Sequence, residues 1–248
     1  MNEQQFNKKG KLYHSARPAY PEALFQTLRE QIPPQSVVAD VGSGTGIFSA
    51  RLLTIAQRVF AVEPNESMRA AAEEAQDSPR FFSVAGSAEA TSLPCACVDC
   101  VTAAQAFHWF DQKQFRAECL RILKPGGLVF LVWNDRELTD PVILQNAEIN
   151  ARFCPRFRGF SNGDCGEQRP FLSSFFGGEY QTVSFPNPTF YSLEQFIARN
   201  LSSSFAPFPE DTGFSAYVAA LTALFEQHCQ DGILRYPYTT HCYFGKLS

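Results

Sequence analysis

The sequence predicts an α/β protein built on a doubly wound, mostly parallel sheet. Short apolar runs, typical of buried strands, alternate between residues 37 and 133 with segments whose apolar residues recur at helical spacing. A glycine-rich turn follows the first apolar run directly. Strands that are apolar on both faces must be covered by helices on both sides, and helical crossovers connect parallel strands.

Strands and helices can be placed in order through the first half of the chain. Strands are predicted at Val37–Val41, Arg58–Val62, Phe81–Val84, Val98–Gln105 and Leu128–Trp133. Helices are predicted at Ile47–Ala56, from the N-cap Asn65 to Gln76, and from the N-cap Asp111 to about Leu123. The Lys124-Pro125-Gly126-Gly127 segment is expected to end the last helix, because Gly and Pro commonly follow helix C-termini.

The strand–helix alternation is lost after Asn134. Helices are predicted at Pro141–Phe153, from Ser192 to about Asn200 and at Gly213–Gln230, a loop at Arg156–Gly166, and strands at Tyr180–Phe185 and Tyr236–Lys246. Ser192 and Gln195 have the spacing of a capping box. We expect a single domain over residues 1–248. Its first half, 1–134, binds a cofactor, and 135–248 supply the last strands and helices that cap the site.

The charge balance and the apolar pattern argue against several partners. The formal net charge is -4, from 21 Lys and Arg against 25 Asp and Glu, with no run of like charges. Binding to phosphate backbones or anionic membranes needs a clustered basic face. Met1 to Lys11 lacks the apolar core of a signal peptide, and no stretch has the roughly 18 apolar residues of a membrane span. We therefore expect a cytoplasmic protein with a small-molecule substrate, and neither nucleic acid nor membrane as partner.

Cysteines at positions 95, 97 and 100 form the only sequence cluster that resembles a metal site. A structural zinc site needs four ligands, usually from two paired knuckles, and no second pair follows. No metal is predicted. In a chain without an export signal, the eight cysteines are expected to be reduced thiols.

The turn from Asp40 to Gly46 indicates a cofactor that contains adenosine. It lies between the first strand and the first helix, and Glu63 ends the second strand, where a carboxylate can accept both hydroxyls of a ribose. The glycine spacing is GxGxG, with Ile47 where a dinucleotide fingerprint has Gly or Ala. Asp40 would be repelled by a pyrophosphate but would favour the ammonium of a methionine moiety. Spacing and charge therefore favour S-adenosylmethionine (SAM) over NAD.

Four motifs in this order resemble those of class I SAM-dependent methyltransferases, and in particular the type 11 methyltransferase family. They are Asp40 to Gly46, Val62 to Asn65 with Met68, Gly86 to Glu89 followed by Leu93-Pro94, and Leu123 to Gly127. A branch of that family also has the segments found here at Arg17 to Pro21 and Gln105 to Phe110. The resemblance covers Tyr13 to Trp133 and implies a seven-stranded, Rossmann-like sheet with helical cap elements.

The resemblance also implies roles for individual residues. Glu63 should bind the ribose, Gly42 and Gly44 should face the methionine part with Asp40, and Asn65 and Met68 should flank the ribose and adenine. The residues implied at the adenine edge or elsewhere around the cofactor are Ser87, Ala88, Glu89, Gln105, Tyr13 and Arg17, and the family commonly has Asp where Ser87 stands. Arg17 suits a bidentate contact with the methionine carboxylate.

The segment after the fourth strand is expected to lie beside the transfer site. His108 has the chemistry of a general base, although a packing role or a cofactor contact is an equal alternative. Trp109 and Phe110 are expected to form a wall of the substrate site.

The predicted function is therefore SAM-dependent methyl transfer to a small molecule, such as the carboxylic acid or hydroxyl of an apolar metabolite. A non-catalytic SAM-binding protein and, with less support, an NAD(P)-dependent oxidoreductase are the alternatives. The acceptor atom, the pathway and the oligomeric state are left open by the sequence.

Overall fold

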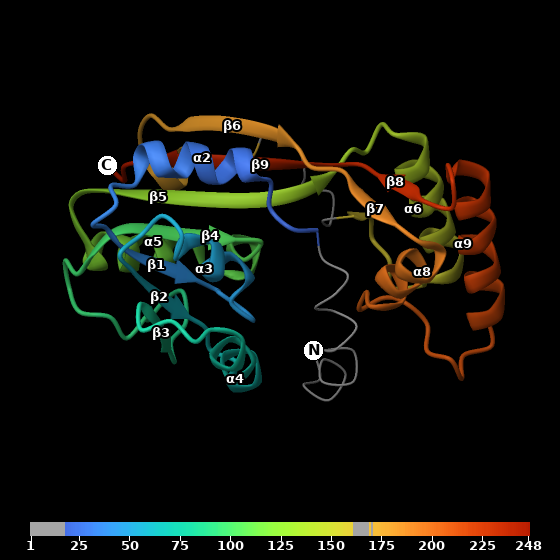
Figure 1. The fold of residues 1–248 in the computed structure, drawn as a ribbon, viewed down its shortest axis with the longest axis horizontal. Coiled ribbons are helices and arrows are strands. Elements are labelled where there is room, and N and C mark those ends of the chain that lie inside the picture. The colour runs from blue at the N-terminus through green and yellow to red at the C-terminus, as the bar shows by residue number, and fades with distance from the viewer. Residues whose placement is uncertain (1–17, 161–168, 170) are drawn as a thin grey trace. The chain divides into compact units, whose positions relative to one another are not determined.

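The computed structural model describes residues 18–160, 169 and 171–248 (Figure 1). These residues form two compact units. The larger unit comprises described residues within 20–134, 167–185 and 240–248, and the smaller one those within 18–19, 135–160 and 186–239. Each unit has its own buried core.

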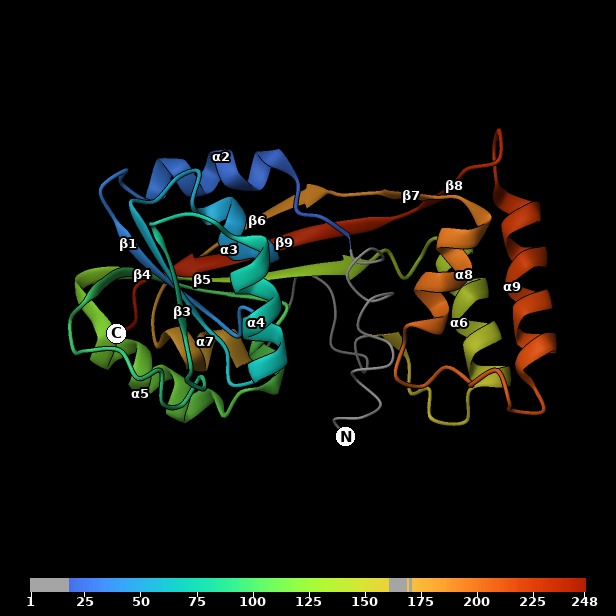
Figure 2. The ribbon, with the colours of Figure 1, turned by 60° about the horizontal axis from the view of Figure 1, so that its bottom comes forward.

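A seven-stranded sheet is the centre of the larger unit, and its order is β3-β2-β1-β4-β5-β9-β6. The strands are β1 (Val37–Val41), β2 (Arg58–Val62), β3 (Phe81–Val84), β4 (Val98–Ala104), β5 (Leu123–Arg136), β6 (Gln181–Pro186) and β9 (Tyr238–Gly245). The pairs from β3 to β5 are parallel, and β9 runs opposite to β5 (Figure 2). The predicted doubly wound, mostly parallel fold is confirmed.

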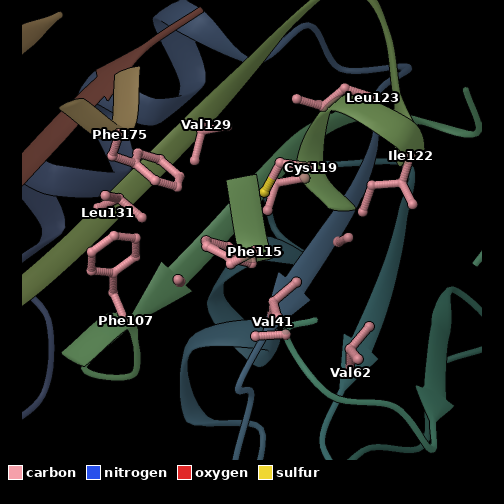
Figure 3. Packing of buried hydrophobic residues seen from close by; sticks show 14 of the residues in the cluster. Val41, Val62, Phe107, Phe115, Cys119, Ile122, Leu123, Val129, Leu131 and Phe175 are labelled. Atoms are coloured by element: carbon pink, nitrogen blue, oxygen red, sulfur yellow. The ribbon is translucent and has the colours of Figure 1, made fainter. Parts of the chain in front are cut away.

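Helices cover both faces of this sheet (Figure 2). The apolar sides of α2 (Glu22–Gln31) and α3 (Ile47–Leu52) pack with one set of strand residues, including Val38 and Phe130. On the opposite face, α5 (Gln112–Ile122) and α7 (Phe171–Phe176) contribute side chains to the second core, which Figure 3 shows. The central strands β1, β4, β5 and β9 supply residues to both cores, as a sheet buried on two sides requires, whereas the edge strand β6 contributes Val183 and Phe185 to the first core only.

Two boundaries in the first half differ from the prediction. Helix α3 ends at Leu52 rather than Ala56. After it the chain continues in tight turns, in which the amides of Thr54 and Ile55 donate to carbonyls three residues earlier. Strand β5 begins at Leu123 rather than Leu128. The pairing with β4 shifts between Val98 and Cys100, so Lys124 to Gly127 bulge out of the ladder instead of forming a separate turn. Helix α4 (Glu66–Ala75) and helix α5 have the predicted N-caps.

The smaller unit packs three helices with a short ribbon. The helices are α6 (Pro141–Phe153), α8 (Leu193–Leu201) and α9 (Phe214–His228), and the antiparallel ribbon pairs β7 (Thr189–Tyr191) with β8 (Leu234–Tyr236). The predicted capping box at the start of α8 is confirmed. The predicted final strand, Tyr236–Lys246, corresponds to β9, which begins after Pro237 at Tyr238; β7, β8 and α7 were not predicted. Within the described part of the chain, no helix combines the length and the apolar character needed to cross a membrane.

Candidate functional site

The order of the strands reverses between β1 and β4, which lie side by side in the sheet. In open α/β sheets, ligands bind outside the carboxyl ends of the strands at such a switch point. The turn after β1 and the segment after β4 both begin there. The residues predicted from the glycine motif and from the segment after strand four are therefore brought to one edge of the sheet.

The glycine turn needs a left-handed backbone at three positions. Gly42, Gly44 and Gly46 have φ of 70°, 56° and 79°. A Cβ on Gly42 would lie 2.6 Å from the Cβ of Ala106, so this glycine lets the β1 turn approach the segment after β4. A Cβ on Gly44 would meet nothing within 4 Å. The turn therefore packs closely at Gly42 and presents open backbone at Gly44.

The carboxylate of Glu63 lies against this turn. Its Oε2 accepts a hydrogen bond from the Gly44 amide at 3.0 Å, and its Oε1 accepts one from the Asn65 amide at 3.0 Å. The residue is only 7% exposed, although it ends a strand at the edge of the sheet. Glu63 is thus oriented by two backbone donors, and it connects the turn after β1 with the start of α4.

Asp40 lies beneath the turn and is almost completely buried. Its carboxylate accepts hydrogen bonds from Ser49 Oγ at 2.5 Å and from Thr102 Oγ1 at 2.8 Å. Burial raises the pKa of Asp40 to about 6, and the negative charge of Glu63 raises it slightly further. The hydrogen bonds from the two hydroxyls oppose this shift by lowering the pKa. Asp40 therefore ties α3 and β4 to the turn, and its predicted effect on an ammonium group stays a prediction.

Residues predicted to flank the ribose and adenine follow β2 and β3. Asn65 caps α4 by accepting from the Met68 amide at 3.0 Å. Ser87 accepts from the Ala90 amide, and the carboxylate of Glu89 accepts from the Asp111 amide at 3.0 Å. Ala88, the remaining member of this set, is buried in the core beneath the segment.

The segment after β4 has a strained start and a firm anchor. Gln105 has a φ of 57°, which is costly for a residue with a Cβ, and its Nε2 donates to the backbone oxygen of Asn134 at 3.0 Å. Phe107 is fully buried and packs edge-on against Phe175 at 4.8 Å between ring centroids. This anchor fixes the short helix η1 (Phe107–Trp109) at the end of the strand.

The two side chains of η1 that follow Phe107 are exposed to solvent. His108 is exposed, Trp109 is 69% exposed, and their rings lie 5.0 Å apart. Phe110 is half-buried, with its ring beside Gly42. Tyr13 and Arg17, predicted to cover the cofactor, lie outside the described residues.

Several residues that hold the site were not identified from the sequence. Ser49 and Thr102 orient Asp40, and Thr91 donates from both its amide and its hydroxyl to Glu118, at 2.7 and 2.6 Å. Ser49 and Thr102 are polar residues at positions that helix or strand periodicity assigns to the core, which is the signal that could have indicated them, whereas Thr91 lies outside any helix or strand. Among the described residues, no group of three or more His, Cys, Asp or Glu side chains is placed to bind a metal ion.

Comparison with known proteins gives one family match, to residues 39–131, described as a methyltransferase domain. An uncharacterized methyltransferase-like protein of Schizosaccharomyces pombe is 34% identical over 144 residues, covering 57% of this chain and 56% of that protein. An uncharacterized methyltransferase of Mycobacterium tuberculosis is 36% identical over 125 residues, or 50% of each. The chain thus matches about half the length of these relatives.

Two solved structures resemble the fold along nearly the whole chain. A putative type II methyltransferase from Anaeromyxobacter dehalogenans has a TM-score of 0.62 at 24% identity, covering 93% of this chain and 98% of that one. A putative methyltransferase from an antibiotic biosynthesis pathway of Anabaena variabilis has a TM-score of 0.59 at 20% identity, covering 91% and 98%.

Proposed function

We propose that the chain transfers the methyl group of SAM to a small-molecule acceptor, and the match of residues 39–131 to the methyltransferase domain family supports this proposal. The family match and the methyltransferase-named relatives support the predicted resemblance to class I SAM-dependent methyltransferases, and with it SAM as the cofactor. The acceptor and the roles of single residues are proposals, argued below from the geometry of the site.

The observation that carries the proposal is the position of Glu63 at the switch-point edge. Each oxygen of its carboxylate accepts one backbone amide, from Gly44 or Asn65, and a carboxylate oxygen has room for a second donor. Two ribose hydroxyls can supply those donors. The open backbone at Gly44 supports close approach of a ligand, so the residues present fit a nucleoside cofactor.

When bound, SAM supplies an electrophilic methyl group on a positively charged sulfur. The chain's contribution is to bind, to align and to exclude water, since correct alignment provides much of the acceleration of such a displacement. We assign Gly42, Gly44 and Asp40 to the methionine end. Asn65, Met68 and the segment from Ser87 to Glu89 belong to the adenosine end. Trp109 and Phe110 form a wall of the acceptor site, and Gln105 supports the loop that carries them.

A titration with SAM, its demethylated product and NADH tests the cofactor. A ligand at 100 times its dissociation constant stabilises the folded state by about 2.7 kcal/mol, which raises the melting midpoint of a chain this size by roughly 5–10 °C. We expect SAM and the product to do so and NADH to have no effect. Stabilisation by NADH alone would favour the oxidoreductase, and SAM binding with no turnover of any acceptor would favour the non-catalytic binding protein.

The Glu63→Gln substitution tests the ribose contact. It removes the charge but nearly keeps the size, and hydrogen bonds to a charged acceptor contribute about 1.5–3 kcal/mol each. We expect SAM affinity, measured by calorimetry, to fall at least tenfold. The matched control is Glu66→Gln, three residues further on and exposed in the first turn of α4, which should bind SAM normally. Unchanged affinity in Glu63→Gln would refute the ribose assignment.

His108 is proposed as the base that accepts the proton of the acceptor. Its exposed position on η1, at the carboxyl end of β4, leaves the imidazole accessible to a substrate. General-base catalysis contributes typically 10²–10⁴-fold. We therefore expect His108→Gln to lower kcat at least a hundredfold while SAM affinity changes by less than about threefold. Equal losses of turnover and SAM affinity would instead make His108 a cofactor contact.

A further inference from the structure

Two arginines of the smaller unit lie among tyrosines rather than carboxylates. Arg136 ends β5, and Arg199 lies in the last turn of α8. Both are half-buried, and among the described residues no Asp or Glu forms an ion pair with either guanidinium. Cations removed from water are normally paired with an anion, so this arrangement is unusual for a purely structural cluster.

Tyr238 lies beside both arginines, in the buried core of this unit. Tyr238 is 3% exposed, and its hydroxyl makes no hydrogen bond of standard geometry to any described residue. The buried Nε of Arg199 beside it likewise makes no hydrogen bond of standard geometry to a described residue. Burial is the largest influence on the Tyr238 phenol and opposes its ionisation. The charges of Arg136 and Arg199, together with hydrogen bonding to Arg199 and Tyr191 outside standard geometry, outweigh burial and lower the pKa of Tyr238. The surroundings of this hydroxyl are therefore strongly positive.

A buried chain of hydrogen bonds fixes Arg136 in place. Its Nε donates to the Tyr236 hydroxyl at 3.3 Å, and that hydroxyl donates to Asn146 Oδ1 at 2.7 Å. Asn146 in turn donates to Asn200 Oδ1 at 2.9 Å. The chain connects the end of β5 to α6 and α8, so the position of the guanidinium is set by the core and not by a flexible side chain alone.

Aromatic rings also lie against Arg136. The guanidinium of Arg136 lies 4.1 Å from the ring centroid of Phe160 and 5.5 Å from that of Tyr238. Both aromatic residues belong to the buried apolar core of this unit. The neighbourhood thus combines fixed hydrogen-bond donors with an apolar wall, which is the arrangement that binds small organic ligands.

We propose that Arg136, Arg199 and Tyr238 form a binding site for the carboxylate of an apolar organic acid. Two planar guanidinium groups and a phenol provide donors in excess of acceptors, and a carboxylate accepts from such donors in bidentate geometry. All three residues lie in the smaller unit, so the proposal does not depend on the proposed methyl transfer. The site concerns recognition only.

The probe is trans-cinnamate, compared by calorimetry with its uncharged analogue trans-cinnamamide and with inorganic phosphate, on the full chain. We expect cinnamate to bind at least tenfold more tightly than the amide and more tightly than phosphate. Arg199→Gln should weaken cinnamate at least tenfold, because it removes a charge-assisted contact. Arg152→Gln, an exposed arginine of α6 in the same unit, is the matched control and should bind cinnamate normally.

Tyr238→Phe separates binding from folding. It removes only a hydroxyl and keeps the aromatic ring in the core, so the protein should stay folded, as its melting transition would show, while cinnamate affinity falls severalfold. Equal binding of acid and amide, unchanged affinity in both site variants, tighter binding of phosphate, or no cinnamate binding at millimolar concentration would each overturn the proposal. Titration of the same samples with SAM keeps the two conclusions apart: loss of SAM binding with intact cinnamate binding would count against the proposed function alone.

Discussion

At the scale of single residues, Gly42 and Gly44 have the same backbone conformation but different neighbours. Gly42 brings the turn after β1 against Ala106, whereas nothing lies within 4 Å of a Cβ placed on Gly44. The first glycine therefore serves close packing, and the second leaves room at the edge of the sheet. This difference allows the folding role of the motif to be separated from its binding role.

We expect Gly42→Ala to lower the free energy of unfolding by about 3 kcal/mol, because it combines overpacking against Ala106 with the strain of an alanine in the left-handed conformation. Gly44→Ala adds the strain alone, about 1 kcal/mol. It should nevertheless weaken SAM binding more than tenfold, since the new methyl occupies the approach to the turn. Denaturant unfolding and SAM titration of the two variants check this. A Gly44→Ala protein that binds SAM as well as the unmodified chain would contradict the assigned role.

At the scale of elements, one carboxylate joins α5 to the segment between β3 and β4. Glu118 on α5 is 7% exposed and accepts from Thr91 and, in bidentate fashion, from Arg121 at 2.7 and 2.6 Å. Hydrogen bonds from Arg121 lower the pKa of Glu118 to about 2, against the effect of burial, and those from Thr91 lower it further. The segment from Ser87 to Glu89 is thus held on the helix by a partly buried ionic network.

Glu118→Gln should lower the free energy of unfolding at pH 7 by about 2 kcal/mol, because charge-assisted hydrogen bonds are lost. The pKa of Glu118 is lower in the folded state than in the unfolded chain, so its stabilisation is complete above about pH 4.5 and is lost as the pH falls toward 2. The stability difference between the two proteins should therefore shrink over that range.

The measurement is urea unfolding as a function of pH, with Glu74→Gln as the matched control. Glu74 is an exposed acid on α4, and its substitution should change stability by less than about 0.5 kcal/mol at every pH. A constant difference between Glu118→Gln and the unmodified chain from pH 7 to pH 3 would show that the charge of Glu118 does not stabilise the fold.

At the scale of the whole molecule, the sheet order explains why residues far apart in sequence share one edge. Because β1 and β4 are neighbours, the glycine turn and η1 start side by side, although about sixty residues separate β1 from β4. The smaller unit is assembled in the same manner: Arg136, Arg199 and Tyr238 come from β5, α8 and β9. The tertiary structure brings both sets of residues together.

The sequence by itself determined the fold class and the first three strands, β1, β2 and β3. It also determined the helix caps at Asn65, Asp111 and Ser192. These features depend on local apolar periodicity and on side chains that bond to nearby amides. The spacing of the glycines with Glu63 was also sufficient to predict the cofactor, because the residues of the proposed ribose contact lie within one β-α-β segment.

Only the tertiary structure decided the rest. Three features depend on which strand lies beside which. Asp40 is buried against Ser49 and Thr102, Lys124 to Gly127 form a bulge, and Pro237 separates β8 from β9. The arginine–tyrosine cluster has no signature in the sequence, since its members are separated by long stretches of chain. Long-range pairing sets such contacts, and local preferences do not contain that information.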